Sequence, residues 1–578
     1  MNNVEEKVRY WQESPYFDEA TREEVKGLSA AEQEERFYMD LEFGTGGLRG
    51  KIGAGTNRIN VYVVRKITQG LADALSEKDE AAKQKGVAIG FDSRRFSGVF
   101  ARETALVLAA NGIKAYLFES LRPVPELSFA VRHCGAAAGV SVTASHNPKE
   151  YNGYKVYGED GGQLPPDMAD NMLRHIEARE NWEIPVMSEE EARGKGLLVT
   201  LGEEIDRVYR QTVRDQLFYG EALQQSANEL KIVYSPLHGS GVMEIPAILK
   251  EAGFTELFVV PEQEQPDPEF STVKQPNPEN PEAFTLAVQY AKARQADIAL
   301  ASDPDSDRLG LYARDENGEY VRFTGNQIGV VLAWYLLSQR KMLGRLPADG
   351  ELITTVASTD LGPAVAARFG VAAKQVLVGF KYIGEQIHLM EETGKGTFLF
   401  GFEESFGYLA GTHARDKDAV QAALVLSEAA WYYKTREHKT LVQVLDEIQQ
   451  ELGYYLDEQV SVAKDGRAGK QVIAEIMQTL TAHPFRELGG IAVQAVEDYK
   501  QRICTYPAEN RTEAITLPQT DALRWRLAGG GFVMARPSGT EPKIKFYFSV
   551  RGEKPEELEA ISKRIQADFF APVQSLLN

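Results

Sequence analysis

The chain has 578 residues, of which 43% are hydrophobic, and its 64 Lys and Arg residues against 84 Asp and Glu residues give a formal net charge of −20. This length exceeds what one hydrophobic core usually supports, so we expect three to five domains. The acidic balance argues against a general affinity for nucleic acid or anionic lipid, because both require a basic surface.

The sequence lacks the features of secreted and membrane proteins. The two cysteines, Cys134 and Cys504, cannot form a disulfide framework and have no metal-ligand spacing. The opening residues, MNNVEEKVRYWQ, have no apolar core and predict no secretory signal. The longest apolar run, residues 328–337, is shorter than the about 20 residues that a bilayer requires. We therefore expect a soluble, cytoplasmic protein.

The first motif along the chain is a glycine-rich segment, FGTGGLRG, at residues 43–50. A dinucleotide fingerprint that begins at Gly44 would need glycine at position 49, which is Arg49. A Walker A loop that ends in Lys51 would need Ser or Thr next, and the residue there is Ile52. We therefore interpret Arg49 as a positive charge at a binding cleft.

A strand–helix–strand pattern then occurs three times, which is typical of α/β units. In each copy a glycine follows the helix where a left-handed C-cap is needed. The copies place strand, helix, glycine and strand at residues 87–91, 102–110, 112 and 114–118; at 231–234, up to 250, 253 and 256–260; and at 352–356, 363–368, 370 and 375–378.

A further strand in each copy runs directly into a polar loop. The three pairs are residues 139–141 before TASHNP, 298–301 before SDPDSDR, and 398–400 before GFEESFG. Ligands of open α/β sheets bind at the carboxyl ends of strands, so we predict one triplicated domain whose three loops face one cleft. Any α/β protein shows strand–helix–strand runs, so the loops have to decide between this interpretation and an unrelated layout.

The first loop, Thr143-Ala-Ser-His-Asn-Pro148, predicts a tight, exposed turn, because its residues continue a strand poorly. Ser145 is a candidate nucleophile, and His146 or Lys155 can supply the nearby charge or base that a hydroxyl nucleophile needs. Taken alone, these six residues favour simple turn formation.

The second loop places Asp303, Asp305 and Asp307 at alternate positions. In an extended loop this alternation turns the three carboxylates to one side, where they would repel each other without a cation. Oxygen-only ligation suits Mg²⁺ or Ca²⁺, but an EF-hand is excluded because its sixth and twelfth positions are Arg308 and Arg314. A solvated acidic turn is the alternative interpretation.

The third loop, GFEESFG, places Glu403 and Ser405 two positions apart, so both can point toward sugar hydroxyls, although Glu-Glu-Ser is also common at surfaces. An amphipathic helix is predicted for residues 419–432. Three cationic residues, for which surface solvation is an equally good explanation, precede this helix: His413, Arg415 and Lys417.

The fourth loop, RPSGTEPK at residues 536–543, has the composition of a phosphate cradle. Gly539 allows the backbone to curl, while Ser538 and Thr540 offer hydroxyls. Arg536 offers a planar guanidinium. An ordinary hairpin rarely needs all four, so we predict a phosphate site separate from the metal loop.

In this order, the four loops, with Asn152-Gly-Tyr-Lys155 after the first, resemble the signature loops of the α-D-phosphohexomutase superfamily, and EESFG and GTGGLRG are most similar to its phosphoglucomutases. The resemblance runs from residue 43 to residue 550. It implies an α/β fold with three similar α/β domains that have mixed sheets and a smaller C-terminal α+β domain, arranged around a central cleft. The implied domains are residues 1–204, 205–325, 326–440 and 441–578, the last with a linker.

The resemblance also implies a role for each matching residue. Ser145 would be the phosphorylated serine, and one Mg²⁺ per chain would be bound by Asp303, Asp305, Asp307 and Ser145. Sugar hydroxyls would contact Glu403 and Ser405, and the non-reacting phosphate would be held by Arg536, Ser538, Gly539 and Thr540. The cleft would further contain the catalytic residues Arg49, His146, Arg308 and Lys417, and Lys155 in substrate binding.

The implied activity is the interconversion of glucose 1-phosphate and glucose 6-phosphate, with glucose 1,6-bisphosphate as intermediate and activator. Phosphopentomutase, phosphomannomutase and sugar-bisphosphate synthase stay open as alternatives, because the loops do not name the sugar. Phe406 and Gly407 stand where many phosphomannomutases have Gly-His, so mannose is less favoured. A phosphatase and a non-catalytic sugar-phosphate sensor are further alternatives. We expect small-molecule sugar phosphates as partners, no nucleic acid, no membrane, and a monomer or weak dimer.

Overall fold

The computed structural model describes residues 3–44, 47–78, 80–164, 166–179, 182–464, 466–538 and 543–577. The chain forms two compact units, each assembled from separate stretches of sequence. Unit 1 comprises Met1–Thr324, Ile383–Lys395 and Phe406–Thr440, and unit 2 comprises Gly325–Tyr382, Gly396–Ser405 and Leu441–Asn578. Among the described helices, none has the length and hydropathy needed to span a membrane.

Unit 1 begins with an α/β part whose sheet has the order β1 (Leu48–Lys51), β5 (Tyr151–Tyr157), β4 (Ala138–Val142), β2 (Val87–Phe91), β3 (Ala115–Phe118) and β6 (Leu198–Leu201). The sheet is mixed, because β2 pairs in parallel with β3 and β4, whereas β5 is antiparallel to β4 and β1. Its helices are α4 (Val61–Lys78), α5 (Glu80–Lys85), α6 (Ser97–Ala110), α7 (Val124–His133), α8 (Pro166–Ala178) and α9 (Glu189–Gly194).

The segment before Phe43 is an integral part of this first core. It forms α1 (Val4–Glu13), α2 (Glu19–Lys26) and α3 (Ala30–Phe37), and Ser29 and Glu32 make a capping box at the start of α3. Trp11 is fully buried, stacks on Phe17 at 4.3 Å between ring centroids, and meets Trp182 edge-on. The N-terminal helices therefore complete the hydrophobic core beside the first sheet.

A second α/β part of unit 1 repeats this topology. Its sheet has the order β11 (Tyr320–Phe323), β10 (Leu309–Arg314), β9 (Ile298–Ser302), β7 (Ile232–Ser235) and β8 (Leu257–Val259). As in the first sheet, the central strand β7 pairs in parallel with two neighbours, and the strand before the polar loop, β9, pairs with the antiparallel β10. Its helices are α10 (Glu203–Arg214), α11 (Gly220–Ser226), α12 (Gly241–Glu251), α13 (Pro261–Glu264) and α14 (Thr285–Arg294).

Unit 1 also includes α17 (Phe380–Thr393) from Ile383 onward, β15 (Gly407–Ala410) and α18 (Ala419–Tyr432). The prediction that residues 419–432 form an amphipathic helix is correct in its bounds and wrong in its character. α18 is buried from Ala419 to Trp431, including the polar side chains of Gln421 and Glu428. Because α18 is buried on all sides, it has no solvent-exposed polar face and is not amphipathic.

Unit 2 contains the third copy of the repeat. Its elements are α15 (Gly325–Met342), β12 (Gly350–Thr355), α16 (Leu361–Phe369), β13 (Ala372–Val376) and β14 (Thr397–Glu403). β12 pairs in parallel with both β13 and β14, as β2 and β7 do with their neighbours. The predicted triplication is therefore confirmed by strand pairing, and its three glycine caps are left-handed, with φ of 72° at Gly112, 104° at Gly253 and 75° at Gly370.

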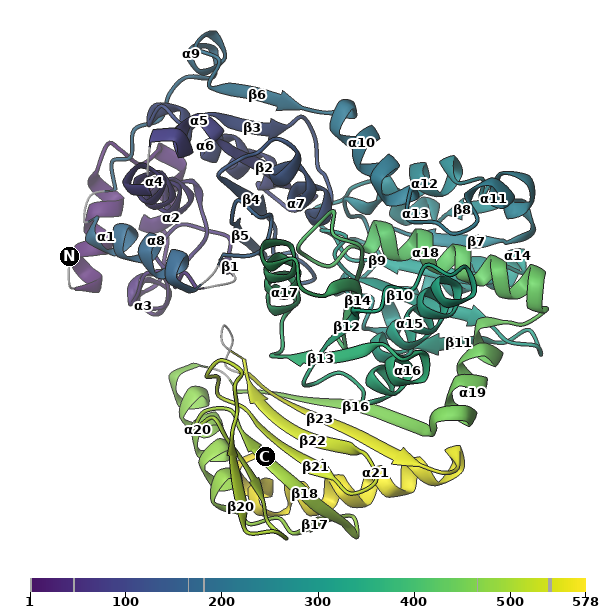
Figure 1. Cartoon of the computed structure of the whole chain (residues 1–578). Helices are drawn as coiled ribbons and strands as arrows, with labels where there is room; N and C mark the ends of the chain where they lie inside the picture. The colour runs from purple at the N-terminus through teal and green to yellow at the C-terminus, as the bar shows by residue number, and fades with distance from the viewer. Residues whose placement is uncertain are drawn as a thin grey trace. The chain divides into compact units, whose positions relative to one another are not determined.

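The C-terminal part of unit 2 is α+β, as predicted. Its antiparallel sheet has the order β16 (Tyr454–Ala463), β23 (Lys543–Gly552), β22 (Gly531–Pro537), β21 (Leu523–Leu527), β18 (Ile491–Asp498), β19 (Ile503–Tyr506) and β20 (Arg511–Ala514), with β17 (Glu487–Leu488) beside β18. The helices α20 (Gly466–Ala482) and α21 (Pro555–Phe570) lie along this sheet (Figure 1). Residues 441–452, predicted as part of a linker, form the helix α19 (Leu441–Leu452), with Leu441, Val444 and Ile448 buried.

At its central strand β22, this C-terminal sheet is buried on both faces. On β22, Val533 and Ala535 belong to the core beneath the helices, together with Trp525 and Phe569. The alternate residues Phe532 and Met534 belong to a second apolar cluster. The other members of that cluster are Tyr499, Ala522 and Tyr547 of the C-terminal part, and Val356, Ala357 and Leu377 of the third repeat. The C-terminal part is therefore packed onto the third repeat inside unit 2.

Candidate active site

Ser145 lies in a turn directly after β4. Its backbone has φ of +51°, a left-handed conformation that costs a non-glycine residue roughly 1–3 kcal/mol and that is concentrated at functional sites. The Ser145 amide donates to Thr143 Oγ1 at 2.8 Å. Ser145 Oγ lies 3.1 Å from His146 Nδ1 and donates to Asp303 Oδ2 at 3.0 Å. A hydroxyl nucleophile, an imidazole and a metal-loop carboxylate are thus brought together.

The prediction of an exposed turn at this loop is half wrong. The turn is present, but Ser145 is only 2% exposed and Asn147 is buried. The loop packs beside the buried residues Asp92 and Arg94, which follow β2, and beside the second repeat through Asp303. Turn composition predicts the local bend, whereas burial depends on these distant segments.

The three aspartates of the second loop converge as predicted, although the loop is not extended. It turns at residues 304–306, and Ser306 has φ of +52°. One carboxylate oxygen from each of Asp303, Asp305 and Asp307 lies within 4.8 Å of the others, and all three residues are buried. Asp303 Oδ1 accepts hydrogen bonds from the backbone amides of Asp307 at 3.1 Å and Arg308 at 3.0 Å, which closes the turn.

Two glycines of the second repeat allow the metal loop to fold this closely. A Cβ atom at Gly239 would lie 2.4 Å from the Cα of Pro304, and one at Gly241 would lie 2.5 Å from Ser306 Oγ. Between them, the amide and hydroxyl of Ser240 both donate to the carbonyl oxygen of Pro304, at 2.8 and 2.9 Å. This support was not predicted, because nothing in the sequence relates residues 239–241 to the loop after β9.

Two lysines pair with the aspartates. Lys155 Nζ donates to Asp305 Oδ2 at 2.8 Å and Asp307 Oδ2 at 3.4 Å, and Lys417 Nζ lies 3.0 Å from Asp307 Oδ2. Burial alone would lower the pKa of Lys155, but Asp305 and Asp307 raise it above its ordinary value. Burial would likewise raise the pKa of Asp307, but Lys417 and Lys155 hold it below its ordinary value. Lys155 is therefore a protonated cation and a poor base.

The aspartate triad fits a hard divalent cation. Asp305 Oδ1 and Asp307 Oδ1 are buried and accept no hydrogen bond from the described residues. Burial, followed by the charges of Asp305 and Asp307, raises the pKa of Asp303 well above its ordinary value, which reports repulsion within the cluster. Three converging carboxylates, two of which have an unused oxygen, are suitable ligands for Mg²⁺. The alternative interpretation as a solvated acidic turn is wrong, because the loop is buried.

The two predicted arginines of unit 1 also lie near this cluster. Arg49, on β1, donates from Nη1 to Asn147 Oδ1 at 3.1 Å. Arg308 pairs with Glu279, and its Nε lies 4.0 Å from Asp303 Oδ2 and 3.9 Å from Asp307 Oδ1. Unit 1 thus brings together the following predicted residues: Arg49, Ser145, His146, Lys155, Asp303, Asp305, Asp307, Arg308 and Lys417.

The other predicted residues belong to unit 2. Glu403 ends β14 and is buried, and Ser405 follows it at intermediate exposure. Arg536 is on β22, and the amide of Ser538 donates to the carbonyl oxygen of Lys543 at 2.7 Å. Gly539 and Thr540 lie outside the described residues.

Asp416 is a site neighbour that sequence reasoning missed. Its Oδ1 accepts from Lys417 Nζ at 3.2 Å, and its Oδ2 accepts from Tyr157 OH at 3.2 Å and Gln163 Nε2 at 3.1 Å. The alternating charges of residues 415–417 were a usable signal, but surface solvation was an equally good explanation. That explanation is wrong, because Arg415, Asp416 and Lys417 are all buried.

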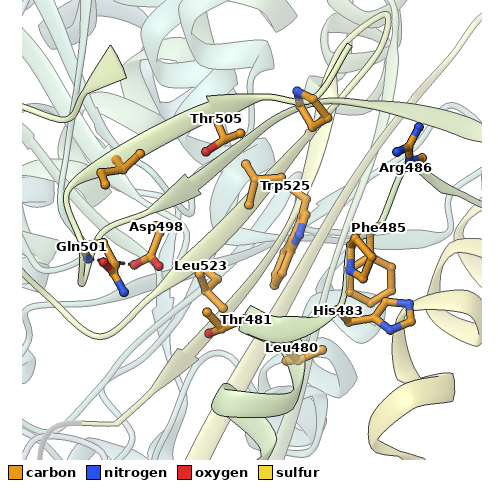
Figure 2. Close-up of a pocket in the computed structure, with 14 residues that line it drawn as sticks. Leu480, Thr481, His483, Phe485, Arg486, Asp498, Gln501, Thr505, Leu523 and Trp525 are labelled. Carbon is orange, nitrogen blue, oxygen red and sulfur yellow. Dashed lines mark hydrogen bonds between the residues drawn. The ribbon is translucent and has the colours of Figure 1, made fainter. Parts of the chain in front are cut away.

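The C-terminal part has a pocket that is separate from these loops. Its volume is ≈ 410 Å³, and Trp525 and Phe485 form much of its wall (Figure 2). Polar residues such as Arg486 and Asp498 line its edges. Neither Arg536 nor Ser538 lines it, so this pocket is not the predicted phosphate site.

A second buried acidic cluster joins the first two repeats. Glu126 of α7, Asp206 of α10 and Glu244 of α12 have carboxylate oxygens within 4.8 Å of one another. Arg122 donates to both oxygens of Asp206 at 2.9 and 2.8 Å, and Arg210 pairs with Glu244 at 2.9 Å. Neither carboxylate oxygen of Glu126 has a hydrogen-bond partner among the described residues. Burial, and then the charge of Glu244, raise the pKa of Glu126 well above its ordinary value.

We expect Glu126→Gln to make the protein less sensitive to alkaline pH. Below the ordinary pKa of 4.5, Glu126 is protonated in both the folded and the unfolded chain, so it costs no stability there. As the pH rises from 4.5 toward the raised pKa of the folded protein, the unfolded chain releases this proton first, and stability is lost. The neutral amide avoids the cost of a buried, unpaired carboxylate, on the order of 1–3 kcal/mol. Thermal unfolding between about pH 5 and about pH 8 should show the gain growing with pH. Glu204→Gln, at an exposed position of the same helix as Asp206, is the control, and an equal loss of stability at every pH would contradict the assignment.

The repeated α/β fold and the buried serine beside three carboxylates are the arrangement expected of a phosphoryl-transfer enzyme. It matches the families described as "Phosphoglucomutase/phosphomannomutase, alpha/beta/alpha domain I" over residues 40–183, "domain II" over 207–318 and "domain III" over 324–452. The chain belongs to the phosphoglucomutase/phosphomannomutase family. This family is part of the phosphohexomutase superfamily, and its enzymes are isomerases that transfer a phosphoryl group.

Similar proteins agree with this membership. The phosphoglucomutase of Staphylococcus haemolyticus is 39% identical over 527 residues, which cover 91% of this chain and 93% of that protein. The phosphoglucomutase of Staphylococcus aureus strain MSSA476 is 36% identical over 546 residues, covering 94% and 95%. A putative phosphomannomutase from Thermus thermophilus shares the fold with a TM-score of 0.67 at 24% identity, covering 91% of this chain and 98% of that one. The Paramecium phosphoglucomutase pp63/parafusin does so with a TM-score of 0.64 at 18% identity, covering 93% and 95%.

Proposed function

We propose that this protein interconverts glucose 1-phosphate and glucose 6-phosphate through phosphorylated Ser145, with glucose 1,6-bisphosphate as the intermediate. The observation that carries the proposal is the 3.0 Å contact between Ser145 Oγ and Asp303 Oδ2, which joins the nucleophile to the aspartate triad in a buried site. The relatives named phosphoglucomutase, at 36–39% identity over most of the chain, support glucose as the sugar.

One Mg²⁺ per chain would be held by Asp303, Asp305, Asp307 and an oxygen on Ser145. Bound there, the ion supplies Lewis-acid neutralisation of charge on the phosphoryl oxygens. The residues of the chain supply the remaining positive charge. Lys155 and Lys417 both form ion pairs with the triad, within 3.4 Å of its oxygens, and Arg308 lies within 4.0 Å.

In the first transfer, the bond between phosphorus and Ser145 Oγ breaks, and a bond forms between phosphorus and the free hydroxyl of the sugar phosphate. The proton that leaves the sugar hydroxyl has to reach Ser145 Oγ. His146, whose Nδ1 lies 3.1 Å from Ser145 Oγ, is placed to accept that proton from the sugar and pass it to Ser145 Oγ. The transition state is loose, so positioning and charge neutralisation supply most of the rate enhancement.

The second transfer requires the bisphosphate to turn over before its other phosphoryl group returns to Ser145. We propose that Glu403 and Ser405 bind the sugar hydroxyls, and that Arg536, Ser538, Gly539 and Thr540 hold the phosphate that is not reacting. Burial of Ser145 also excludes water, which would otherwise hydrolyse the phosphoserine. Free glucose 1,6-bisphosphate would act as activator by restoring any lost phosphoserine.

We further propose a cytoplasmic enzyme that is a monomer or weak dimer, with domain boundaries near residues 204, 325 and 440. The acidic net charge, which disfavours binding to anionic lipid, supports this location. Light scattering of the purified protein measures the oligomeric state.

Substrate comparison tests the proposal. With a trace of glucose 1,6-bisphosphate, we expect kcat/KM for glucose 1-phosphate to exceed the values for ribose 1-phosphate and mannose 1-phosphate by roughly 10-fold or more, since a site built for particular hydroxyls rejects analogues that leave its polar groups unpaired. Faster turnover of ribose 1-phosphate would identify a phosphopentomutase instead. Stoichiometric release of inorganic phosphate would identify a phosphatase.

A further inference from the structure

The Arg94 side chain forms hydrogen bonds with the backbone of the turn that contains Ser145. Its Nη2 donates to the carbonyl oxygens of Ser145 and Asn147, and its Nη1 donates to those of Pro148 at 2.9 Å and Tyr151 at 3.1 Å. The Arg94 side chain is fully buried, at 0% exposure. One guanidinium therefore binds four carbonyl oxygens of the phosphoserine loop, using the donors that only arginine presents in a planar fork.

The guanidinium is itself held in place. Asp92 Oδ2 lies 3.3 Å from Arg94 Nε, and the guanidinium carbon lies 5.0 Å from the ring centroid of Phe270, a buried residue of the second repeat. Asp92 Oδ2 also accepts from Thr143 Oγ1 at 2.7 Å, and the same Thr143 Oγ1 accepts from the amide of Ser145. Ser145 is thus fixed at its amide through Thr143 and at its carbonyl through Arg94, and both connections lead back to Asp92.

This arrangement matters because Ser145 adopts an unfavourable backbone conformation, with φ of +51°. Such a conformation persists only where the surrounding structure determines it. The four carbonyl oxygens also accept hydrogen bonds from Arg94, so a cation engages their negative ends. A small displacement of a reacting group lowers the rate of transfer strongly.

We propose that Arg94 is a positioning residue for phosphoryl transfer: through the loop carbonyls it holds Ser145 in the left-handed conformation from which Oγ reaches the aspartate triad. Phe270 completes this function by fixing the plane of the guanidinium. The inference rests on the proposed function, because it takes Ser145 as the phosphorylated residue. Arg94 acts through the backbone of residues 145–151 and is not assigned a contact with the sugar.

Arg94→Lys tests the proposal, because lysine keeps the charge and loses the fork. We expect kcat for glucose 1-phosphate to fall roughly 10- to 100-fold while KM stays within about threefold, since the sugar-binding residues are untouched. Incubation of this variant with glucose 1,6-bisphosphate should phosphorylate Ser145 to the same final extent as in the wild type, but at a lower rate. Intact-mass spectrometry measures both the extent and the rate. A residue that merely supported the fold would lower the thermal midpoint without this split between kcat and KM.

Arg95→Lys is the matched control. Arg95 is the next residue, its side chain is 43% exposed, and it pairs with Glu269 at the surface, so kcat should stay at the wild-type value. Phe270→Leu is the second test, because it leaves all four carbonyl bonds and removes the ring beside the guanidinium. We expect it to lower kcat about two- to fivefold at unchanged KM.

The outcomes separate this inference from the proposed function. A Ser145→Ala enzyme with wild-type activity would overturn the proposed function, whereas a folded Arg94→Lys enzyme with wild-type kcat would overturn the role of Arg94 alone. If Arg94→Lys does not fold, a slower Phe270→Leu enzyme supports the proposal. Wild-type turnover by Phe270→Leu in that case overturns it.

Discussion

The Ser145→Ala enzyme is expected to lose turnover of glucose 1-phosphate by roughly 10⁴-fold or more, because the group that breaks and remakes the phosphorus–oxygen bond is absent. Ser145 Oγ has both contacts that the transfer requires, with His146 Nδ1 at 3.1 Å and Asp303 Oδ2 at 3.0 Å. A coupled assay for glucose 6-phosphate, supplied with a trace of glucose 1,6-bisphosphate, measures the loss. Intact-mass spectrometry should show one phosphoryl group on the wild-type chain and none on the variant.

Ser76→Ala is a suitable control for this experiment. The Ser76 hydroxyl donates a hydrogen bond to the carbonyl oxygen of Ala72 within α4, and Ser76 is not among the proposed site residues. Its removal should leave both phosphorylation and turnover unchanged. Equal rates for wild type and Ser145→Ala would refute a phosphoserine mechanism, and phosphate found on the Ser145→Ala chain would place the phosphoryl group on a different residue.

Asp305→Asn is expected to have the second largest effect, a loss of roughly 10²- to 10³-fold in activity at moderate Mg²⁺ concentration. The substitution removes a negative charge from the triad and offers an amide in place of a carboxylate oxygen that accepts no hydrogen bond from the described residues. Because binding of the ion is weakened, excess Mg²⁺ should restore part of the activity. The Mg²⁺ concentration that gives half-maximal rate and the Kd for Mg²⁺ measured by calorimetry should therefore rise together.

Asp446→Asn controls for the change of charge, because Asp446 is exposed on α19 and accepts a hydrogen bond from Gln450. Chelation of divalent ions should silence the wild-type enzyme, and readdition of Mg²⁺ should restore it. An Asp305→Asn enzyme with an unchanged Mg²⁺ requirement would show that the triad is not the metal site.

The three repeats could be predicted from sequence because each depends on local patterns. Apolar strands such as residues 87–91 are buried and parallel, and a glycine with positive φ ends each helix, so composition alone reports both. The convergence of Ser145 with Asp303 followed from the same pattern, since both loops lie at the carboxyl ends of equivalent strands, β4 and β9.

What the sequence did not reveal depends on contacts between distant segments. Arg94 is one polar residue after a strand, and its four acceptors lie more than 50 residues farther along the chain. Glu126, Asp206 and Glu244 come from three separate helices. The character of α18 was missed for the same reason, because Gln421 and Glu428 are buried by neighbours that helical periodicity does not describe.

The two-sided burial of β22 limits how this chain can be divided. A fragment that ended at Leu452 would keep the third repeat but would expose Val356, Ala357 and Leu377 to solvent. These three side chains would lose their apolar contacts with the cluster residues Phe532, Met534 and Tyr547. Exposed apolar patches of this kind promote self-association. The C-terminal part is therefore not an independent domain that can be removed. Truncated chains that contain only the three repeats would be prone to aggregation.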